Sequence, residues 1–285
     1  FTHMKLIKAA LPTAVMLIAS TSCTLDEPSY PAGAASQMRL SSVSSYGVTL
    51  MKWEYDKQNR VTEINVGRDM IYRFTYTGDS KIPSTISGET YDYYYSDDDT
   101  EVRYKDGEWE WTEIKADSRG YITQYNCDET DFFIDQEPDN TVSVVKFTYD
   151  SNGQLTRMED TSYDDMLNKV VDSDNYNWQN GLLLSRTEAS DDSNQLTILC
   201  EYSDLDNPNR QWDPNNEFLG PLGTTGFFGV GPKKFPSRTQ TSNGNYYTET
   251  IQYAYTLLPN GLIRMSKVKE GDDITVVMTY TYEKL

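Results

Sequence analysis

The chain has 285 residues, and its 44 Asp and Glu outnumber its 25 Lys and Arg to give a formal net charge of −19. Such an acidic surface repels nucleic acid and anionic lipid, so neither is expected as a partner. The one histidine, His3, lies in residues 1–3, which precede Met4 and are interpreted as a cloning scar or a miscalled start. With it set aside, histidine-based nucleophile systems and zinc sites are excluded. No Walker loop or GxGxxG follows a strand, so no nucleotide and no cofactor is expected.

Residues 1–22 are interpreted as a signal peptide. Lys5 and Lys8 supply the positive region, and the apolar stretch from residue 9 to residue 19 is too short to span a bilayer as a helix. Ser22 before Cys23 resembles a bacterial lipobox. The resemblance implies cleavage before Cys23 and lipidation of its sulfur and its new amino group. The alternative is a plain signal peptide with an incidental cysteine.

The residues that follow indicate where the protein is exported. Asp26 and Glu27 lie just past the lipid site and resemble the export signal of surface lipoproteins in Bacteroidota-type bacteria. Residues 23–37 are interpreted as the lipid anchor and a flexible tether, because the segment is rich in Pro, Gly, Ala and Ser. We therefore expect an outer-membrane lipoprotein, exposed on the cell surface and held to the membrane by its N-terminal lipid.

Residues 38–285 predict a single all-β domain. Met51, Trp53 and Tyr55 alternate with charged residues, and the same alternation recurs at 72–76, 145–149, 251–255 and 274–282. Strand-length runs recur at intervals of about 8–12 residues, which predicts about 14–18 antiparallel strands in an up-and-down meander. The expected fold is a closed or flattened β-barrel, and the alternative is two stacked β-sheets.

A membrane porin is a third possibility, because transmembrane strands also alternate apolar and polar residues. Most runs here are shorter than the ~9–11 residues of a bilayer strand, and Thr and Ser interrupt their apolar faces. We therefore expect a barrel that is soluble without detergent.

A short unit recurs along these strands. Residues 53–62 align with residues 147–156, and residues 176–183 and 253–263 are weaker copies. Each unit has an aromatic strand, a turn built on Asn-Gly or an equivalent, and a second strand opened by a branched residue. Asn-Gly suits such turns because both residues accept a positive φ at little cost. The unit resembles the YD repeat of the large Rhs-type shell proteins.

Across nearly the whole of this domain the sequence is similar to a family of exported Bacteroidota lipoproteins of unknown function, described as having a porin-like fold. The matching residues are Tyr202-Ser203-Asp204, Asn207-Pro208, the stretch from Phe218 to Phe228, Phe235-Pro236-Ser237 and Tyr280-Thr281-Tyr282. The family has no established catalytic residues, so the resemblance implies a fold and leaves the function open.

The segment at about 205–235 breaks the strand rhythm with four prolines and five glycines. Because it is also rich in aromatic residues, we expect an ordered insertion that packs over or into the sheet. Its rings are the candidate ligand-binding residues, as a platform on which a sugar stacks: Trp212, Phe218, Phe227 and Phe228. Trp109, Trp111 and Trp178 are further candidates, and Trp109 and Trp111 are equally suited to a core.

Acidic clusters and two cysteines complete the inventory. Four clusters, at residues 97–99, 164–165, 172–174 and 191–192, offer oxygen ligands for calcium, but most fall where solvated turns are expected, so no metal site is assigned. Cys127 and Cys200 either remain as buried free thiols or form a disulfide, which an exported protein permits.

Two functional hypotheses follow, and both describe a non-enzyme. The first is a surface protein that binds a glycan or peptide on aromatic groups beside the insertion. The second is a structural or accessory subunit that docks another envelope protein. A pocket lined by the insertion rings would favour the first, and the same rings buried against the sheet would favour the second. A glycoside hydrolase is a distant third, because the sequence nominates no pair of carboxylates.

Overall fold

The computed structural model describes residues 38–95, 101–132, 139–163, 168–189, 195–215, 218–243, 247–270 and 274–285. They form sixteen strands. The bounds are β1 Met38–Ser45, β2 Val48–Tyr55, β3 Val61–Val66, β4 Met70–Thr75, β5 Thr85–Tyr95, β6 Glu101–Ala116, β7 Ile122–Asp131, β8 Asp139–Tyr149, β9 Leu155–Tyr163, β10 Lys169–Gln179, β11 Leu182–Ala189, β12 Leu196–Asp206, β13 Lys234–Asn243, β14 Tyr247–Leu257, β15 Ile263–Glu270 and β16 Ile274–Lys284.

The strands form one closed antiparallel barrel in which each strand pairs with its neighbours in sequence. Closure comes from β1 and β16, where Met38 lies opposite Lys284 and Val43 lies opposite Tyr280. An ion pair reinforces the seam, with 2.8 Å between Arg39 Nε and Glu283 Oε1. The predicted meander and barrel are confirmed, and the alternative of two stacked sheets is wrong. Closing the ring removes the unpaired edges that a sheet of this size would expose.

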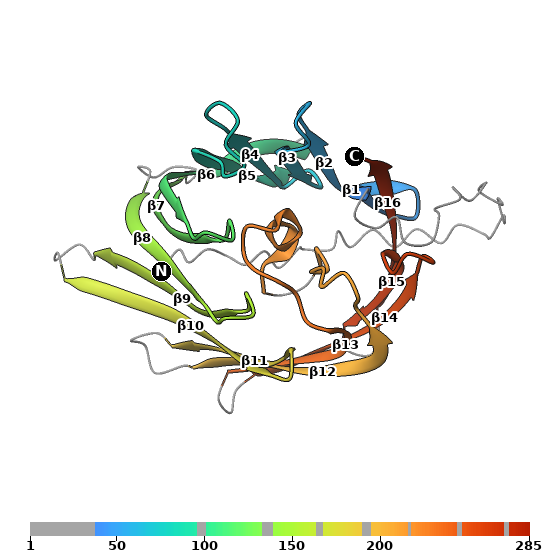
Figure 1. Ribbon diagram of the computed structural model, residues 1–285. Coiled ribbons are helices and arrows are strands. Elements are labelled where there is room, and N and C mark those ends of the chain that lie inside the picture. The colour runs from blue at the N-terminus through green and yellow to red at the C-terminus, as the bar shows by residue number, and fades with distance from the viewer. Residues whose placement is uncertain are drawn as a thin grey trace.

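Figure 1 shows the strands as a ring that encloses the segment between β12 and β13, drawn in orange. The turns that follow even-numbered strands lie at one end of the barrel, together with Met38 and Lys284. This end, which the β12–β13 connection fills, is named the sealed end. The opposite end, where the turns follow odd-numbered strands, is named the far end.

Alternation along each strand places apolar side chains inside the barrel and polar ones outside. On β2, Met51 and Trp53 are buried, whereas Lys52 and Glu54, which alternate with them, are exposed. The strand β16 repeats the pattern, since Val276, Met278, Tyr280 and Tyr282 are all buried. This is the expected period of two for strands with one face in a core.

Three hairpin turns at the sealed end are built on an aspartate. The Oδ1 atoms of Asp56, Asp117 and Asp150 each accept hydrogen bonds from the backbone N–H groups two and four residues later, at 2.8–3.1 Å. The third residue after each aspartate has a positive φ, at Asn59, Gly120 and Gly153. In Asn152-Gly153 only the glycine has a positive φ, so the expected use of both residues holds for Asn180-Gly181 and not there.

Six hairpins whose two strands are connected at the far end are held together at the sealed end by an aromatic side chain. In each, a ring in or just after the second half of an even-numbered strand donates a hydrogen bond to a backbone carbonyl near the start of the preceding strand. The bonds, 2.7–2.9 Å long, run from Tyr55 to Leu40, Tyr76 to Val61, Tyr149 to Ile122, Trp178 to Leu155, Tyr202 to Leu183 and Tyr282 to Ile263. These bonds are named the aromatic clasps. They link each recurring unit to the strand that follows it, because the residue that opens the second strand of a unit supplies the carbonyl, as Val61 does for Tyr76 and Leu155 for Trp178.

One argument from the sequence against a porin is wrong. Nine of the sixteen strands have ten residues or more, and β6 has 16, so strand length does not distinguish this barrel from a membrane barrel. Among the residues that the structure describes, no helix is long and apolar enough to cross a membrane.

Candidate functional site

The connection between β12 and β13 lies inside the barrel at its sealed end. Residues 207–233, named the insertion, include a short 3₁₀ helix, η2 (Gly220–Thr225). Pro221 lies in the first turn of η2, and Gly226 ends it with a φ of 79°. Prolines and glycines at this spacing prevent a strand, because they remove ladder hydrogen bonds and favour turns. The insertion fills space that the wall side chains of so wide a barrel leave open.

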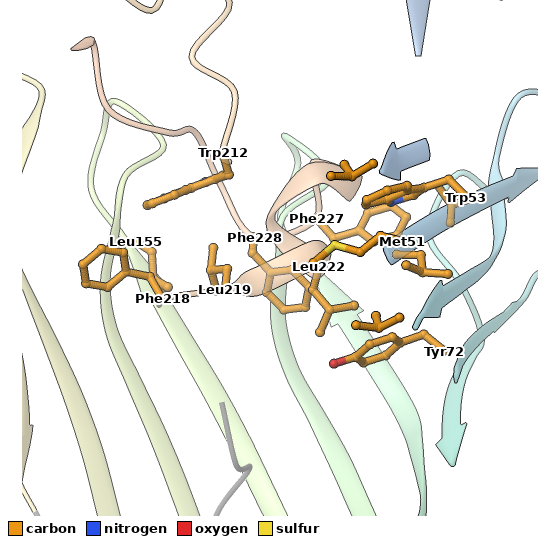
Figure 2. Packing of buried hydrophobic residues seen from close by; sticks show 14 of the residues in the cluster. Met51, Trp53, Tyr72, Leu155, Trp212, Phe218, Leu219, Leu222, Phe227 and Phe228 are labelled. Atoms are coloured by element: carbon orange, nitrogen blue, oxygen red, sulfur yellow. The ribbon is translucent and has the colours of Figure 1, made fainter. Parts of the chain in front are cut away.

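The rings proposed for ligand stacking form the core of the insertion (Figure 2). The exposed fractions are 5% for Trp212, 5% for Phe218, 9% for Phe227 and 2% for Phe228. Phe228 meets two wall rings edge-on, with centroid distances of 5.3 Å to Phe147 and 6.4 Å to Trp111. Trp212 lies edge-on to Trp178 at 6.1 Å and contacts Phe218 at 6.3 Å. A ligand could stack on these rings only after the insertion had moved.

A small cavity remains between the insertion and strands β11 to β13. Its volume is about 20 Å³, and its lining includes Leu183, Tyr202, Trp212, Phe218 and Phe235. That volume is about one water molecule. A sugar ring does not fit there.

The backbone of the insertion is bonded to the hairpin turns around it. Phe227 O accepts a hydrogen bond from Ile122 N at 2.8 Å, Val230 N donates to Gly153 O at 2.9 Å, and Lys233 N donates to Gly181 O at 2.9 Å. A Cβ atom at Gly229 would collide with Gly153 O. The insertion is therefore fixed to the β6–β7, β8–β9 and β10–β11 turns, and it closes this end of the barrel.

Asp213 is the polar anchor of the insertion and is only 4% exposed. Its carboxylate accepts hydrogen bonds from the phenol of Tyr255 at 2.8 Å and from that of Tyr280 at 2.9 Å. Asn215 donates its backbone N–H and its side-chain amide to the same carboxylate, at 3.0 and 2.9 Å. Burial, followed by the neighbouring Asp213 charge, raises the pKa of both phenols well above the usual value. Both phenols therefore stay protonated and remain donors.

Replacing Asp213 by Ala is expected to lower the free energy of unfolding by about 2 kcal/mol, because two buried phenols lose their acceptor. Urea unfolding followed by circular dichroism measures this change. Asp204→Ala is the matched control: Asp204 is exposed and lies in the same region, so its loss should change stability by less than about 0.5 kcal/mol. Equal effects of the two substitutions would show that Asp213 does not anchor the insertion.

Beyond the insertion, the inner wall turns polar on β10 and β11. Arg186 Nη2 and Asp174 Oδ2 form an ion pair at 2.8 Å, with side chains only 7% and 3% exposed. Tyr176 lies opposite Arg186 across the strand pair, and burial raises its pKa above the usual value. A buried ion pair of this kind adds little net stability because both charges lose their hydration, although removing one partner alone is destabilising.

The outer wall carries a network of charges across β3 to β6. Arg73 lies 2.9 Å from Glu89 and 3.6 Å from Glu63, and Lys105 lies 3.3 Å from Glu89 and in close contact with Glu108. A membrane barrel needs an apolar outer band about 25 Å tall. Charged side chains on four adjacent strands interrupt such a band.

Several residues singled out in the sequence lie outside the described residues. They are Cys23, Asp26 and Glu27 of the anchor, and the acidic clusters 97–99, 164–165 and 191–192. Asp172 and Asp174 belong to β10, so the expectation that acidic clusters occupy turns is wrong for them. Among the described residues, no group of three or more His, Cys, Asp or Glu is arranged to hold a metal ion. Of the other tryptophans considered, Trp111 is buried, and Trp109 stacks on it at 5.0 Å.

Cys127 and Cys200 do not form a disulfide and lie on different parts of the wall, in β7 and β12. Burial, followed by the charge of Glu129, raises the pKa of the Cys127 thiol to about 12. Thiolate is the reactive form, and its share at a given pH falls tenfold for each unit of pKa.

At pH 8 the thiolate share of Cys127 in the folded protein is roughly a thousandfold smaller than that of a thiol of pKa 9, and the greater nucleophilicity of the more basic thiolate offsets part of this. We therefore expect it to react with a disulfide reagent roughly thirtyfold more slowly than such a thiol. Labelling kinetics in a Cys23→Ser, Cys200→Ser background, with and without denaturant, measure the rate. Similar rates in the folded and unfolded protein would contradict the prediction.

Sequence reasoning missed Asp213 and its two phenol donors. An acidic residue beside a proline in a loop is ordinarily solvated, and nothing in the spacing links Asp213 to Tyr255 or Tyr280. The only sequence feature that pointed to a buried position was the neighbouring Trp212, because a large aromatic residue in an ordered segment is usually buried.

No protein-family model matches the chain, and no curated protein matches it. Solved structures do share the fold. A porin-like protein from Bacteroides uniformis has a TM-score of 0.51 at 16% identity, over 90% of this chain and 100% of that one. A porin-like protein from Bacteroides vulgatus has a TM-score of 0.52 at 11% identity, over 87% of this chain and 100% of that one. Likeness at this identity shows the fold alone.

Proposed function

We propose that this protein is a non-catalytic lipoprotein of the outer-membrane surface that docks another envelope protein, and that its barrel is closed at the sealed end. The burial of Trp212, Phe218, Phe227 and Phe228 carries the proposal. These rings are used up in filling the barrel, so the insertion acts as a plug rather than as a platform for a small ligand. A rigid closed barrel then offers its outside and its rims for recognition.

The outer wall supports placement outside the bilayer. The ion pairs of Arg73 and Lys105 with Glu89 face outward, and a lipid environment would have to desolvate them. Membrane contact then falls to the lipid on Cys23. Asp26 and Glu27 direct this lipoprotein to the outer leaflet in the proposal, as the resemblance to surface lipoproteins implies.

Cys23→Ala is expected to abolish lipid labelling and to release the protein from the membrane fraction, because it removes the whole anchor. The released protein should stay in solution without detergent and should give no stepwise conductance in a planar bilayer. Cys200→Ala, the control, should keep both the lipid and the membrane location. Membrane retention of the Cys23 variant, a need for detergent, or channel steps would each defeat the proposal. Protease treatment of intact cells carrying Asp26→Ala and Glu27→Ala then tests surface exposure.

A further inference from the structure

Strands β5 and β6 extend past their neighbours at the far end. The pairing of β4 with β5 reaches only Met70 opposite Thr90, and that of β6 with β7 reaches only Gly107 opposite Asp131. Beyond these points, residues 91–95 pair with residues 101–105, and Asp106 lies at a register shift. Two backbone bonds of 2.8 Å join the base of these stretches to their neighbours, from Tyr91 N to Asp69 O and from Phe132 N to Asp106 O. The two stretches, 91–95 and 101–106, are named the ribbon. It projects beyond the rim and has a face on each side.

On one face of the ribbon, the tyrosine rings are stacked with arginine side chains of the same chain. The guanidinium of Arg103 lies 3.6 Å from the ring centre of Tyr91, and that of Arg68 lies 4.6 Å from the ring centre of Tyr93. Tyr93 Oη donates to the backbone oxygen of Arg68 at 2.8 Å, and Arg68 pairs with Glu101 at 2.7 Å. The tyrosines on this face therefore already have cation and hydrogen-bond partners within the chain.

The opposite face combines two tyrosines with two aspartates. Tyr94 and Tyr104 have ring centroids 5.8 Å apart, and Tyr94 is 43% exposed. Tyr104 Oη donates to Asp92 Oδ2 at 3.3 Å. Asp106 Oδ1 is buried and accepts no hydrogen bond. Asp106 lies two residues from Tyr104 on β6, which places it on the same face of the strand, and the residue is partly exposed. Desolvation, followed by the charge of Asp92, raises the pKa of the Tyr104 phenol.

This second face is not matched by a cation in the way the first is. None of the cation–ring contacts among the described residues involves Tyr94 or Tyr104. A guanidinium is the group that fits both of its features, since its plane stacks on a phenol ring and its N–H fork bonds to a carboxylate. The same chain uses this chemistry on the other face.

We propose that the Tyr94–Tyr104 face of the ribbon, with Asp92 and Asp106, docks an arginine-bearing extended segment of another protein. The inference rests on the proposed function and names the surface and the partner chemistry for it. The net charge of −19 also favours a basic partner and repels an acidic one. The location agrees as well. The tether precedes Met38 at the sealed end, so the ribbon is at the end of the barrel away from the proposed anchor.

Fluorescence anisotropy at low salt with a short labelled peptide of alternating Arg and Ser tests this on the Cys23→Ala protein. The Arg peptide should bind more tightly than its Lys counterpart, and a Glu counterpart should not bind. Asp92→Asn with Asp106→Asn should weaken binding roughly tenfold, and Tyr94→Ala roughly threefold. The charge-matched control, Asp128→Asn with Asp204→Asn, removes two exposed aspartates elsewhere and should change the affinity less than about twofold. Tyr46→Ala, at an 84% exposed ring on the β1–β2 turn, is the control for Tyr94.

Three results would overturn the inference. One is no binding of the Arg peptide, and another is equal weakening by the two aspartate pairs, which would mean diffuse attraction to an acidic protein. The third is binding of a neutral oligosaccharide at Tyr94 in place of the peptide. Circular dichroism of each variant verifies folding. A failure here with a detergent-free, non-conducting barrel leaves the proposed function standing, whereas channel activity defeats that function whatever the peptide does.

Discussion

Replacing Trp212 by Ala is expected to lower the free energy of unfolding by about 3–5 kcal/mol, since it removes a buried indole and leaves a cavity. The side chain is 5% exposed and contacts both Trp178 on the wall and Phe218 within the insertion. In a domain of this size the loss corresponds to a fall in Tm of roughly 10 °C. Calorimetry measures the fall. Tyr163→Ala, at a ring that is 63% exposed, is the control and should shift the Tm by no more than a degree or two.

The same variant separates the two functional hypotheses. If Trp212 were a ligand platform, Trp212→Ala would weaken binding on a glycan array and leave the Tm nearly unchanged. A large fall in Tm with no glycan binding by either protein is the result expected of a plug. An unchanged Tm together with loss of a glycan signal would restore the binding hypothesis and require an insertion that opens.

The second large effect is expected at the buried ion pair of β10 and β11. Arg186→Met should lower the free energy of unfolding by about 3–5 kcal/mol, because it leaves the carboxylate of Asp174 buried without its cation. The pair is 2.8 Å apart, and neither side chain is more than 7% exposed. Denaturant unfolding at neutral pH measures the change.

A double variant makes the cause testable. Arg186→Met combined with Asp174→Leu replaces the pair by apolar groups and should recover most of the lost stability, because no fully buried charge remains and Glu188, the other partner of Arg186 at 3.8 Å, is 29% exposed. The exposed pair of Arg238 and Glu201, 2.9 Å apart, is the control, and breaking it with Arg238→Met should cost less than about 1 kcal/mol. If the double variant is as unstable as Arg186→Met, the loss comes from packing of the arginine side chain and not from charge.

Strand alternation made the β-meander predictable, because Met51 and Trp53 on one face and Lys52 and Glu54 on the other allow only one orientation on a half-buried strand. Closure of the barrel was harder to predict from the sequence. It depends on Met38 meeting Lys284 across nearly the whole chain, and local periodicity does not distinguish a ring from two stacked sheets. Strand length was misjudged because polar ends such as Glu101 to Asp106 continue a ladder without an apolar signal.

The insertion shows the limit for the candidate site. Its composition predicted order, but a loop has no period from which the exposure of Trp212 or Phe228 can be derived. The insertion rings are buried because of the width of the barrel, which follows from the number of strands. Sixteen strands leave an interior that the wall side chains do not fill. Asp213 is buried for the same reason, and its position beside Tyr280 depends on residues far apart in sequence.

The aromatic clasps have a consequence for how such a barrel arises and changes in evolution. A hairpin such as β7–β8 is joined covalently at the far end and by the Tyr149–Ile122 bond at the sealed end, so both of its ends are held by its own residues. A gene segment encoding one such hairpin therefore also encodes both partners of its aromatic clasp. Its duplication or loss changes the circumference by two strands without requiring a new clasp elsewhere. The segment that must adapt to each change in width is the plug, and an irregular, glycine-rich loop is the part of the chain that tolerates such remodelling best.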